Sequence, residues 1–318
     1  MGNSPDGHEM AKELEKQIAE LEGTSNPSAA QEEIERLRQQ VVALRQKVSG
    51  PPQDAWERVL LARHPQRPYT LDYIQLLFTD FMELHGDRRF ADDAAMIAGF
   101  AQFEDRPAVV IGQQKGRDTK QKLYRNFGMV NPEGYRKAMR VMELGSKFGA
   151  PILSFIDTPG AYPGIGAEER GQAEAIAHNL KEMCKLLVPV IVIVHGEGGS
   201  GGALAIAIGD EVLMHENAIY SVISPESCSS ILWRDWDHKQ EAARLLKLTA
   251  EDLYRMQLVD QVVPEPVGGA HTNHAQAAEL LRPVLRATLD VLTKLSPADL
   301  IKRRREKFRR LASFTTET

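Results

Sequence analysis

Short apolar runs and amphipathic stretches alternate along the chain, which is typical of a protein that winds strands and helices together. The runs at 152–156 and 190–194 are too continuously apolar to have a wet face, so each predicts a strand that is covered on both sides. Each run ends in a glycine-rich loop, and helical stretches follow at 168–187 and between 201 and 209. Two successive strand–loop–helix units imply right-handed crossovers and a largely parallel sheet.

The same patterning predicts the remaining elements of the main domain. Residues 94–103 and 109–113 read as two strands of a hairpin, joined by a polar turn that contains proline. Amphipathic periodicity predicts further helices, and short apolar runs predict further strands. The helices are expected at 55–63, 70–84, 132–148, 227–233, 249–258, 274–295 and 299–311, and the short strands at 210–214, 218–222 and 259–263.

The first 50 residues predict a helical arm. Leu14, Ile18 and Leu21 share one helical face, and a second seam of apolar residues at spacings of three and four follows a break at 23–27. Two such helices can fold back on each other as a hairpin or pack on a partner chain. We therefore divide the chain into an arm at 1–50, a linker with a short helix at 51–67, and a main domain at 68–318.

Composition narrows the class of protein. The chain has 318 residues, 42% of them hydrophobic, and a net charge of 39 − 44 = −5, which gives no general argument for nucleic-acid binding. No charge-free apolar run reaches ~18 residues and no signal peptide precedes the arm, so we expect a cytoplasmic protein without a membrane span. Cys184 and Cys228 provide neither a disulfide framework nor a metal site, and we expect no metal.

The most informative segment is the turn that follows the strand at 190–194. Five glycines lie within 196–202, and an apolar helix begins at Gly201 and Gly202. Glycine permits a tight turn and a close backbone approach, and the first N–H groups of a helix have no intrahelical partner. Such donors, at the positive end of the helix dipole, stabilise developing negative charge. We interpret the turn as an oxyanion hole made by backbone amides.

Other interpretations of this turn are open from the residues alone. Residues 196–201 match the dinucleotide pattern G-x-G-x-x-G, but they lie late in the chain. Residues 198–202 match the nucleophile turn G-x-S-x-G, with Ser200 as the nucleophile. A hydrolase would also need an acid and a histidine, for which the candidates are Asp210, Asp235, His238 and His271. The turn could equally do no more than pack a helix on the sheet.

Two basic segments predict solvated surfaces. The loop after the strand at 109–113 carries Lys115, Arg117 and three further basic residues up to position 125, and the final helix carries a basic run at 302–310. Charge runs of this kind usually face water. A P-loop is excluded, because no G-x-x-x-x-G-K-[ST] accompanies the D-x-x-G at 157–160.

Taken together, the motifs resemble one known family, the carboxyltransferase alpha subunits of bacterial acetyl-CoA carboxylase. The resemblance runs from about Pro68 to the C terminus, and the arm matches only loosely. The segments that carry it are 115–117 (KGR), 125–128 (RNFG), 132–137 (PEGYRK), 155–164 (FIDTPGAYPG), 166–172 (GAEERGQ), 196–205 (GEGGSGGALA) and 220–226 (YSVISPE).

The resemblance implies a fold and a reaction. It implies the α/β crotonase fold, a spiral of ββα units that forms two near-perpendicular sheets flanked by helices. It also implies transfer of a carboxyl group from carboxybiotin, held on the biotin carboxyl carrier protein, to acetyl-CoA, giving malonyl-CoA for fatty-acid synthesis. Biotin and a CoA thioester are thus the expected cofactor and substrate, and biotin carboxylase is expected in the larger complex.

The resemblance further implies a site shared between subunits. The oxygen of biotin would meet the N–H groups of Gly201 and Gly202, with the missing side chain of Gly202 leaving room for it. A beta subunit that carries a zinc ribbon would hold the thioester, in an α2β2 tetramer. Alternatives are a biotin-dependent acyl-CoA decarboxylase, a propionyl-CoA carboxyltransferase subunit and a non-catalytic scaffold. Weaker candidates for shaping the biotin pocket are Gly164, Gly166, Gly198 and Gly199.

Overall fold

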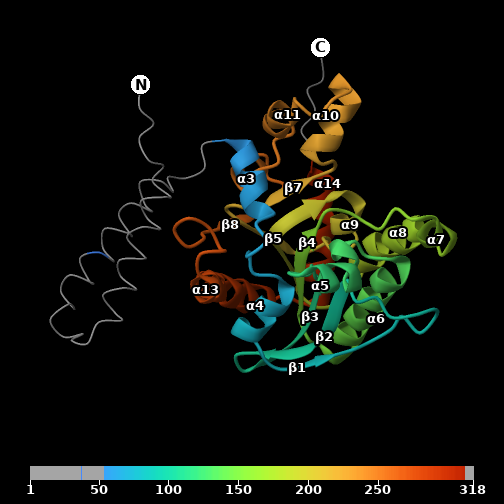
Figure 1. The fold of residues 1–318 in the computed structure, drawn as a ribbon. Coiled ribbons are helices and arrows are strands. Elements are labelled where there is room, and N and C mark those ends of the chain that lie inside the picture. Colours follow the sequence, from blue (N-terminus) through green and yellow to red (C-terminus); the bar gives the residue numbers. More distant parts are fainter. Residues whose placement is uncertain (1–36, 38–53, 312–318) are drawn as a thin grey trace, which may run out of the picture.

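One mixed sheet of eight strands forms the centre of the protein (Figure 1). The computed structural model describes residue 37 and residues 54–311. The strands lie in the order β1-β2-β3-β4-β5-β6-β8, and β7 pairs with β5. Their bounds are β1 Thr79–Glu83, β2 Met96–Phe103, β3 Arg106–Gln113, β4 Ile152–Thr158, β5 Val190–Gly199, β6 Glu211–His215, β7 Ile219–Ser221 and β8 Gln261–Val263.

Helices surround this sheet, and most of them lie where the periodicity predicts. The agreement is complete for α6, Pro132–Phe148, which begins with proline at its first position and ends before Gly149 in a left-handed conformation. The other helices are α3 Ala55–Ala62, α4 Thr70–Leu77, α5 Thr119–Tyr124, α7 Ile165–Glu169, α8 Gln172–Met183, α9 Ser200–Leu204, α10 Pro225–Trp233, α11 Lys239–Leu245, α12 Ala250–Arg255, α13 His274–Leu292 and α14 Pro297–Arg310, with a 3-10 turn at Asn126–Gly128.

The strand directions confirm the predicted hairpin and the predicted parallel sheet. β2 pairs antiparallel with β3 and with β1, whereas β3, β4, β5, β6 and β8 run parallel to one another. β5 is long enough to pair twice: its residues 191–194 lie beside β6, and its residues 197–199 lie beside β7. The second pairing therefore belongs to the same continuous sheet as the first, so the described residues form one sheet and not the two separate sheets that were expected.

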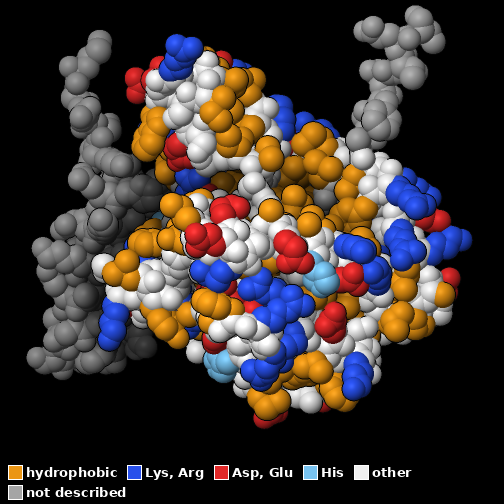
Figure 2. Space-filling view, turned by 90° about the vertical axis from the view of Figure 1, so that its right-hand side faces the viewer, with side chains coloured by type: hydrophobic (Ala, Val, Ile, Leu, Met, Phe, Trp, Pro, Cys, Tyr) orange, Lys and Arg blue, Asp and Glu red, His pale blue; other side chains and the backbone are white. Residues whose placement is uncertain are grey.

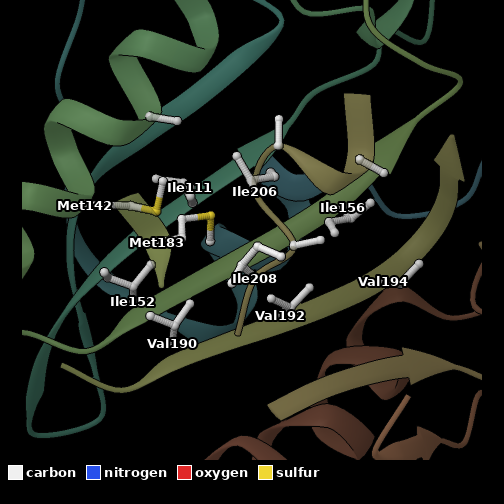
Figure 3. Packing of buried hydrophobic residues seen from close by; sticks show 14 of the residues in the cluster. Ile111, Met142, Ile152, Ile156, Met183, Val190, Val192, Val194, Ile206 and Ile208 are labelled. Atoms are coloured by element: carbon white, nitrogen blue, oxygen red, sulfur yellow. The ribbon is translucent and has the colours of Figure 1, made fainter. Parts of the chain in front are cut away.

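Both faces of the central strands are buried, as their continuous apolar runs predict. Ile152 and Val190 point into a core shared with α6 and α8, and their neighbours Leu153 and Ile191 point into a second core shared with α4 and α13. Figure 3 shows the first core, where Ile152, Val190 and Val192 pack against Met142 of α6 and Met183 of α8. The two cores hold β4 and β5 side by side and fix the positions of the loops at their carboxyl ends.

Three predicted helices are wrong in length. The helix expected at 70–84 ends at Leu77, because Phe78 is extended and the following residues pair as β1 with β2. The helix expected at 168–187 is broken at Gly171, whose φ of 81° is left-handed, and the helix expected between 201 and 209 ends at Leu204. Strand pairing and a glycine turn override the helical period at the first two places. The sequence prediction also omitted α5 and α11.

The predicted arm at 1–50 lies outside the described residues except for Leu37, and the divisions at 50 and 67 stay predictions. Within the described part of the chain, no helix is long and apolar enough to cross a membrane.

Cys184 and Cys228 are both free thiols.

Candidate active site

The turn between β5 and α9 has no connecting residue. β5 ends at Gly199 and α9 begins at Ser200, so the chain changes direction within one residue. Ser200 has a φ of 49°, a left-handed conformation that residues other than glycine seldom adopt. The buried strand β5 leads directly into this turn. The N–H groups of the next two residues, Gly201 and Gly202, follow Ser200.

These two N–H groups are unpaired donors of the turn. Among the described residues, no hydrogen bond is donated by the N–H of Gly201 or of Gly202. Their carbonyls, in contrast, are held: that of Gly201 accepts from the N–H of Ala205 at 3.0 Å, and that of Gly202 accepts from Gln113 Nε2 at 3.0 Å and from the Tyr135 hydroxyl at 3.3 Å. The turn thus combines fixed peptide planes with free donors, which suits an oxyanion hole.

The space around the glycines corrects the role expected for Gly202. A Cβ atom on Gly202 would lie 2.3 Å from the N atom of Ala161 and 2.4 Å from the carbonyl carbon of Gly160, so its missing side chain makes room for the protein's own backbone. A Cβ on Gly201 would meet only Ile176, whose nearest atom is 3.8 Å away. The open position beside the free donors is therefore Gly201.

Gly198 and Gly199 are also packed against the protein. A Cβ on Gly198 would lie 2.7 Å from the ring of Tyr220, and one on Gly199 would lie 2.2 Å from the carbonyl oxygen of Pro159. At both positions the absence of a side chain lets the turn pack closely against neighbouring parts of the protein. Their expected contribution to a biotin pocket stays a prediction.

Gly164 and Gly166 lie in the other loop, between β4 and α8. A Cβ on Gly164 would meet the ring of Tyr162 at 2.4 Å, and one on Gly166 would meet Arg170 Nη1 at 3.1 Å. Contacts link α7 to α8 and α8 to α9, so this loop reaches the turn through α8 (Figure 1). Gly198, Gly199, Gly201 and Gly202 follow one another at the turn, whereas Gly164 and Gly166 lie at the start of α7.

A buried ionic network ties the carboxyl ends of three strands together. Lys115, which follows β3, forms ion pairs with Asp157 of β4 at 2.7 Å and with Glu197 of β5 at 3.4 Å. Glu197 also pairs with Arg63 at 2.6 Å, and its N–H donates to Asp157 Oδ1 at 3.0 Å. Burial alone would lower the pKa of Lys115, but Asp157 and Glu197 raise it above its usual value. Lys115 is thus a cation that fixes the strand ends, which corrects the prediction of a solvated residue.

Comparison with known proteins decides the family. Residues 6–312 match the model of a family described as acetyl co-enzyme A carboxylase carboxyltransferase-like. The chain is 59% identical over 259 residues to the acetyl-coenzyme A carboxylase carboxyl transferase subunit alpha of Geobacter sulfurreducens, covering 81% of each chain. It is 53% identical over 320 residues to the subunit of the same name from Chlorobium phaeovibrioides, covering 96% of each chain.

The chain belongs to the acetyl-CoA carboxylase carboxyltransferase alpha-subunit family. It is a subunit of an enzyme, and the reaction of that family is a biotin-dependent carboxyl transfer with a CoA substrate.

Solved structures show the same fold at low sequence identity. A transcarboxylase 12S chain superposes with a TM-score of 0.58 at 17% identity, covering 76% of this chain and 45% of the transcarboxylase chain. A chain of a Pseudomonas malonate decarboxylase hetero-tetramer gives a TM-score of 0.58 at 16% identity, covering 76% of this chain and 97% of that chain. The expected crotonase-like carboxyltransferase fold is therefore confirmed.

The geometry does not support a hydrolase. Among the described residues, no histidine or carboxylate forms a hydrogen bond with the Ser200 hydroxyl. Asp210 forms a fully buried ion pair with Arg304 at 2.7 Å, and the ring of His271 stacks on His64. His238 and Asp235 lie 3.9 Å apart beyond α10, where the His238 ring stacks on Trp233. The candidate acids and histidines are engaged elsewhere, and the alpha-subunit family accounts for the turn without them.

Sequence reasoning missed the side chains that support the turn. Gln113 and Tyr135 hold the Gly202 carbonyl, and Lys115 holds Asp157 and Glu197. The available signal was positional: Gln113 and Lys115 lie at the end of a strand that is parallel to β4, and the carboxyl ends of parallel strands share one edge of a sheet.

Proposed function

We propose that the N–H groups of Gly201 and Gly202 bind the ureido oxygen of carboxybiotin during carboxyl transfer. The observation that carries this proposal is the pair of unpaired N–H groups beside the open position at Gly201. An acceptor oxygen that gains negative charge is bound more tightly by such donors than a neutral one. One preorganised donor of this kind contributes ~2.7 to 4 kcal/mol to the stabilisation of a transition state.

Carboxybiotin, when bound, supplies the carboxyl group that acetyl-CoA accepts in exchange for a methyl proton, so that malonyl-CoA and biotin are the products. The residues of this chain bind and orient carboxybiotin in that reaction. Gly201 and Gly202 donate hydrogen bonds, while Gln113 and Tyr135 hold the carbonyl of Gly202, in the peptide that follows these donors. Gly198 and Gly199 pack against Tyr220 and Pro159 beside the turn, and Gly164 and Gly166 are the further candidates for shaping the biotin pocket.

The proposed assembly follows the family. The biotin is carried on a biotin carboxyl carrier protein, and a zinc-ribbon beta subunit binds the acetyl-CoA thioester in an α2β2 tetramer, with biotin carboxylase in the larger cytoplasmic complex. Large apolar side chains are exposed near the turn, and Figure 2 shows hydrophobic groups gathered on the upper part of one face. Exposed apolar patches mark partner surfaces. The first of them to follow the turn in the chain are Leu204, Val222, Ile231 and Leu232.

The test is reconstitution from purified subunits. The chain alone offers one amide pair, whereas the reaction develops negative charge on two acceptor oxygens, so it lacks part of the electrostatic stabilisation and the thioester site. We expect no malonyl-CoA from carboxybiotin and acetyl-CoA with the purified chain, and turnover when the beta subunit is added. Propionyl-CoA, assayed in parallel, reports the acyl preference. Full turnover by the chain alone would refute the shared site.

A further inference from the structure

Gln113 links the two loops of the candidate site. It is the last residue of β3 and is fully buried. Its Nε2 donates to the carbonyl of Gly202 at 3.0 Å, and its Oε1 accepts from the N–H of Asp157 at 3.2 Å. One side-chain amide therefore holds the turn after β5 and the end of β4 at the same time.

Gln113 is itself held in place. Its backbone carbonyl accepts from the Thr70 hydroxyl at 2.6 Å, at the first residue of α4. The carbonyl of Gly202 receives a second donor, the Tyr135 hydroxyl of α6, at 3.3 Å. Thr70, Tyr135 and Gln113 are each fully buried, so water cannot replace these bonds when one is lost.

Both peptide planes that flank Gly202 are thus anchored through their carbonyls. The plane that carries the Gly202 N–H is held by the bond between the Gly201 carbonyl and Ala205, and the next plane is held by Gln113 and Tyr135. The backbone of Gly160 and Ala161 packs so closely against Gly202 that a Cβ atom would have no room there. The bond from Gln113 therefore fixes the backbone on the carbonyl side of Gly202, next to the plane that carries its N–H.

We propose that Gln113 is a positioning residue for carboxyl transfer, which keeps Gly202, and with it the donor group of that residue, in place by holding the Gly202 carbonyl. The proposal rests on the proposed function of the Gly201–Gly202 amides. Preorganised donors owe their effect to orientation set before the reaction, so a turn that can rotate loses part of its stabilisation of the transition state.

Two variants test this in the assembled enzyme. Gln113→Met keeps the length of the side chain but removes both hydrogen bonds, and we expect kcat to fall tenfold or more with an unchanged KM for acetyl-CoA. Gln113→Glu restores a donor only when its carboxyl group is protonated, and burial favours that form. Its kcat relative to the wild type should rise as the pH is lowered from 9 to 7, while that of Gln113→Met stays flat.

Two further variants set the scale. Ser154→Ala removes another fully buried donor. The Ser154 hydroxyl donates to the carbonyl of Ile206, in the segment that follows α9, at 2.6 Å. This variant loses a buried hydrogen bond that does not hold the Gly202 carbonyl, and we expect its kcat to stay within twofold of the wild type. Tyr135→Phe removes the longer of the two bonds to the Gly202 carbonyl, and its loss of kcat should lie between those of Ser154→Ala and Gln113→Met.

Amide hydrogen exchange separates this proposal from the proposed function. Gln113→Met should speed exchange at residues 205–207, whose N–H groups bond to the carbonyls of Gly201, Ala203 and Leu204, and Ser154→Ala should not. Faster exchange with normal kcat would mean that Gln113 holds a turn that does not touch the reacting oxygen, which contradicts both proposals. Unchanged exchange, with either normal or reduced kcat, would overturn the positioning role and leave the amide assignment standing.

Discussion

The two strand–loop–helix units differ in what happens to their backbone donors. After β4, the segment 159–164 crosses the edge of the sheet before α7 begins, and the N–H groups of Gly160 and Tyr162 donate to Thr158 Oγ1 and to the Val130 carbonyl, both at 3.1 Å. After β5, the turn has no connecting residue, and among the described residues the N–H groups of Gly201 and Gly202 have no acceptor.

This difference shows that glycine content alone does not mark an anion site. The loop after β4 lies against the turn after β5, with Pro159 beside Gly199 and Gly160 beside Gly202. Glycine is required at 199 and 202 because another backbone occupies the place of a side chain. Among Gly198, Gly199, Gly201 and Gly202, a Cβ atom would find open space at Gly201 alone, so the first loop supports the second and the second presents the donors.

The largest effect should come from separating the two loops. Gly199→Ala would place a Cβ 2.2 Å from the carbonyl oxygen of Pro159, so one loop must shift. We expect a loss of about 1 to 3 kcal/mol in the free energy of unfolding, typical of overpacking, and a loss of about 100-fold or more in kcat, typical of a displaced catalytic group. Urea unfolding and an assay of the assembled enzyme measure the two. Wild-type values in both would show that the loops do not touch.

Acid should weaken the sheet that carries the second unit. His195 of β5 and His215 of β6 are fully buried, and burial lowers the pKa of each to about 3. The unfolded chain binds protons at these residues below about pH 6.5 and the folded chain does not, so stability falls as the pH drops through 6.5. Between pH 7 and 5.5 we expect the two histidines to cost about 2 to 3 kcal/mol in the free energy of unfolding.

Urea unfolding of the purified chain at the two pH values checks this loss. His238→Asn is the control, because the side chain of His238 is 42% exposed and its replacement should leave the pH dependence unchanged. Equal stability at both pH values would mean that the histidines are not buried in the neutral form.

The smallest effect should come from the Ser200 hydroxyl. It has no histidine or carboxylate partner among the described residues, and the reaction uses the amides that follow it. Ser200→Ala should keep kcat of the assembled enzyme within about tenfold, or 1.4 kcal/mol. Stoichiometric labelling of Ser200 by a fluorophosphonate, with loss of carboxyl transfer, would instead identify a nucleophile.

The strands were predictable because burial on both faces leaves a continuous apolar run. Val190 to Val194 can be neither an exposed strand nor one face of a surface helix, and the structure buries every residue of that run. The length of α4 was not predictable from its own segment, because residues 79–83 become a strand only through their pairing with β2. Hydrophobic periodicity shows which side of a segment faces water, whereas strand pairing depends on a partner strand elsewhere in the chain.

The position of the candidate site was predictable from the sequence, but only some of its residues were. The glycine turn after an apolar strand identified Gly201 and Gly202, because a free helix N-terminus follows from local sequence. The supports did not follow, since Gln113 lies 89 residues from Gly202 and Lys115 lies 82 residues from Glu197. Even the reason for glycine at 202 needed the fold, because the atoms that exclude a side chain there belong to Gly160 and Ala161.

The most direct measurement of the amide assignment is kcat and thermal stability of Gly201→Ala in the assembled enzyme. The fold has room for the new methyl group, whose nearest neighbour would be Ile176 at 3.8 Å, so we expect an unchanged melting temperature. The methyl group would enter the space beside the free N–H groups, and we expect kcat to fall about 10- to 100-fold, or about 1.4 to 2.7 kcal/mol. Wild-type kcat at a wild-type melting temperature would contradict the assignment of these amides to the biotin oxygen.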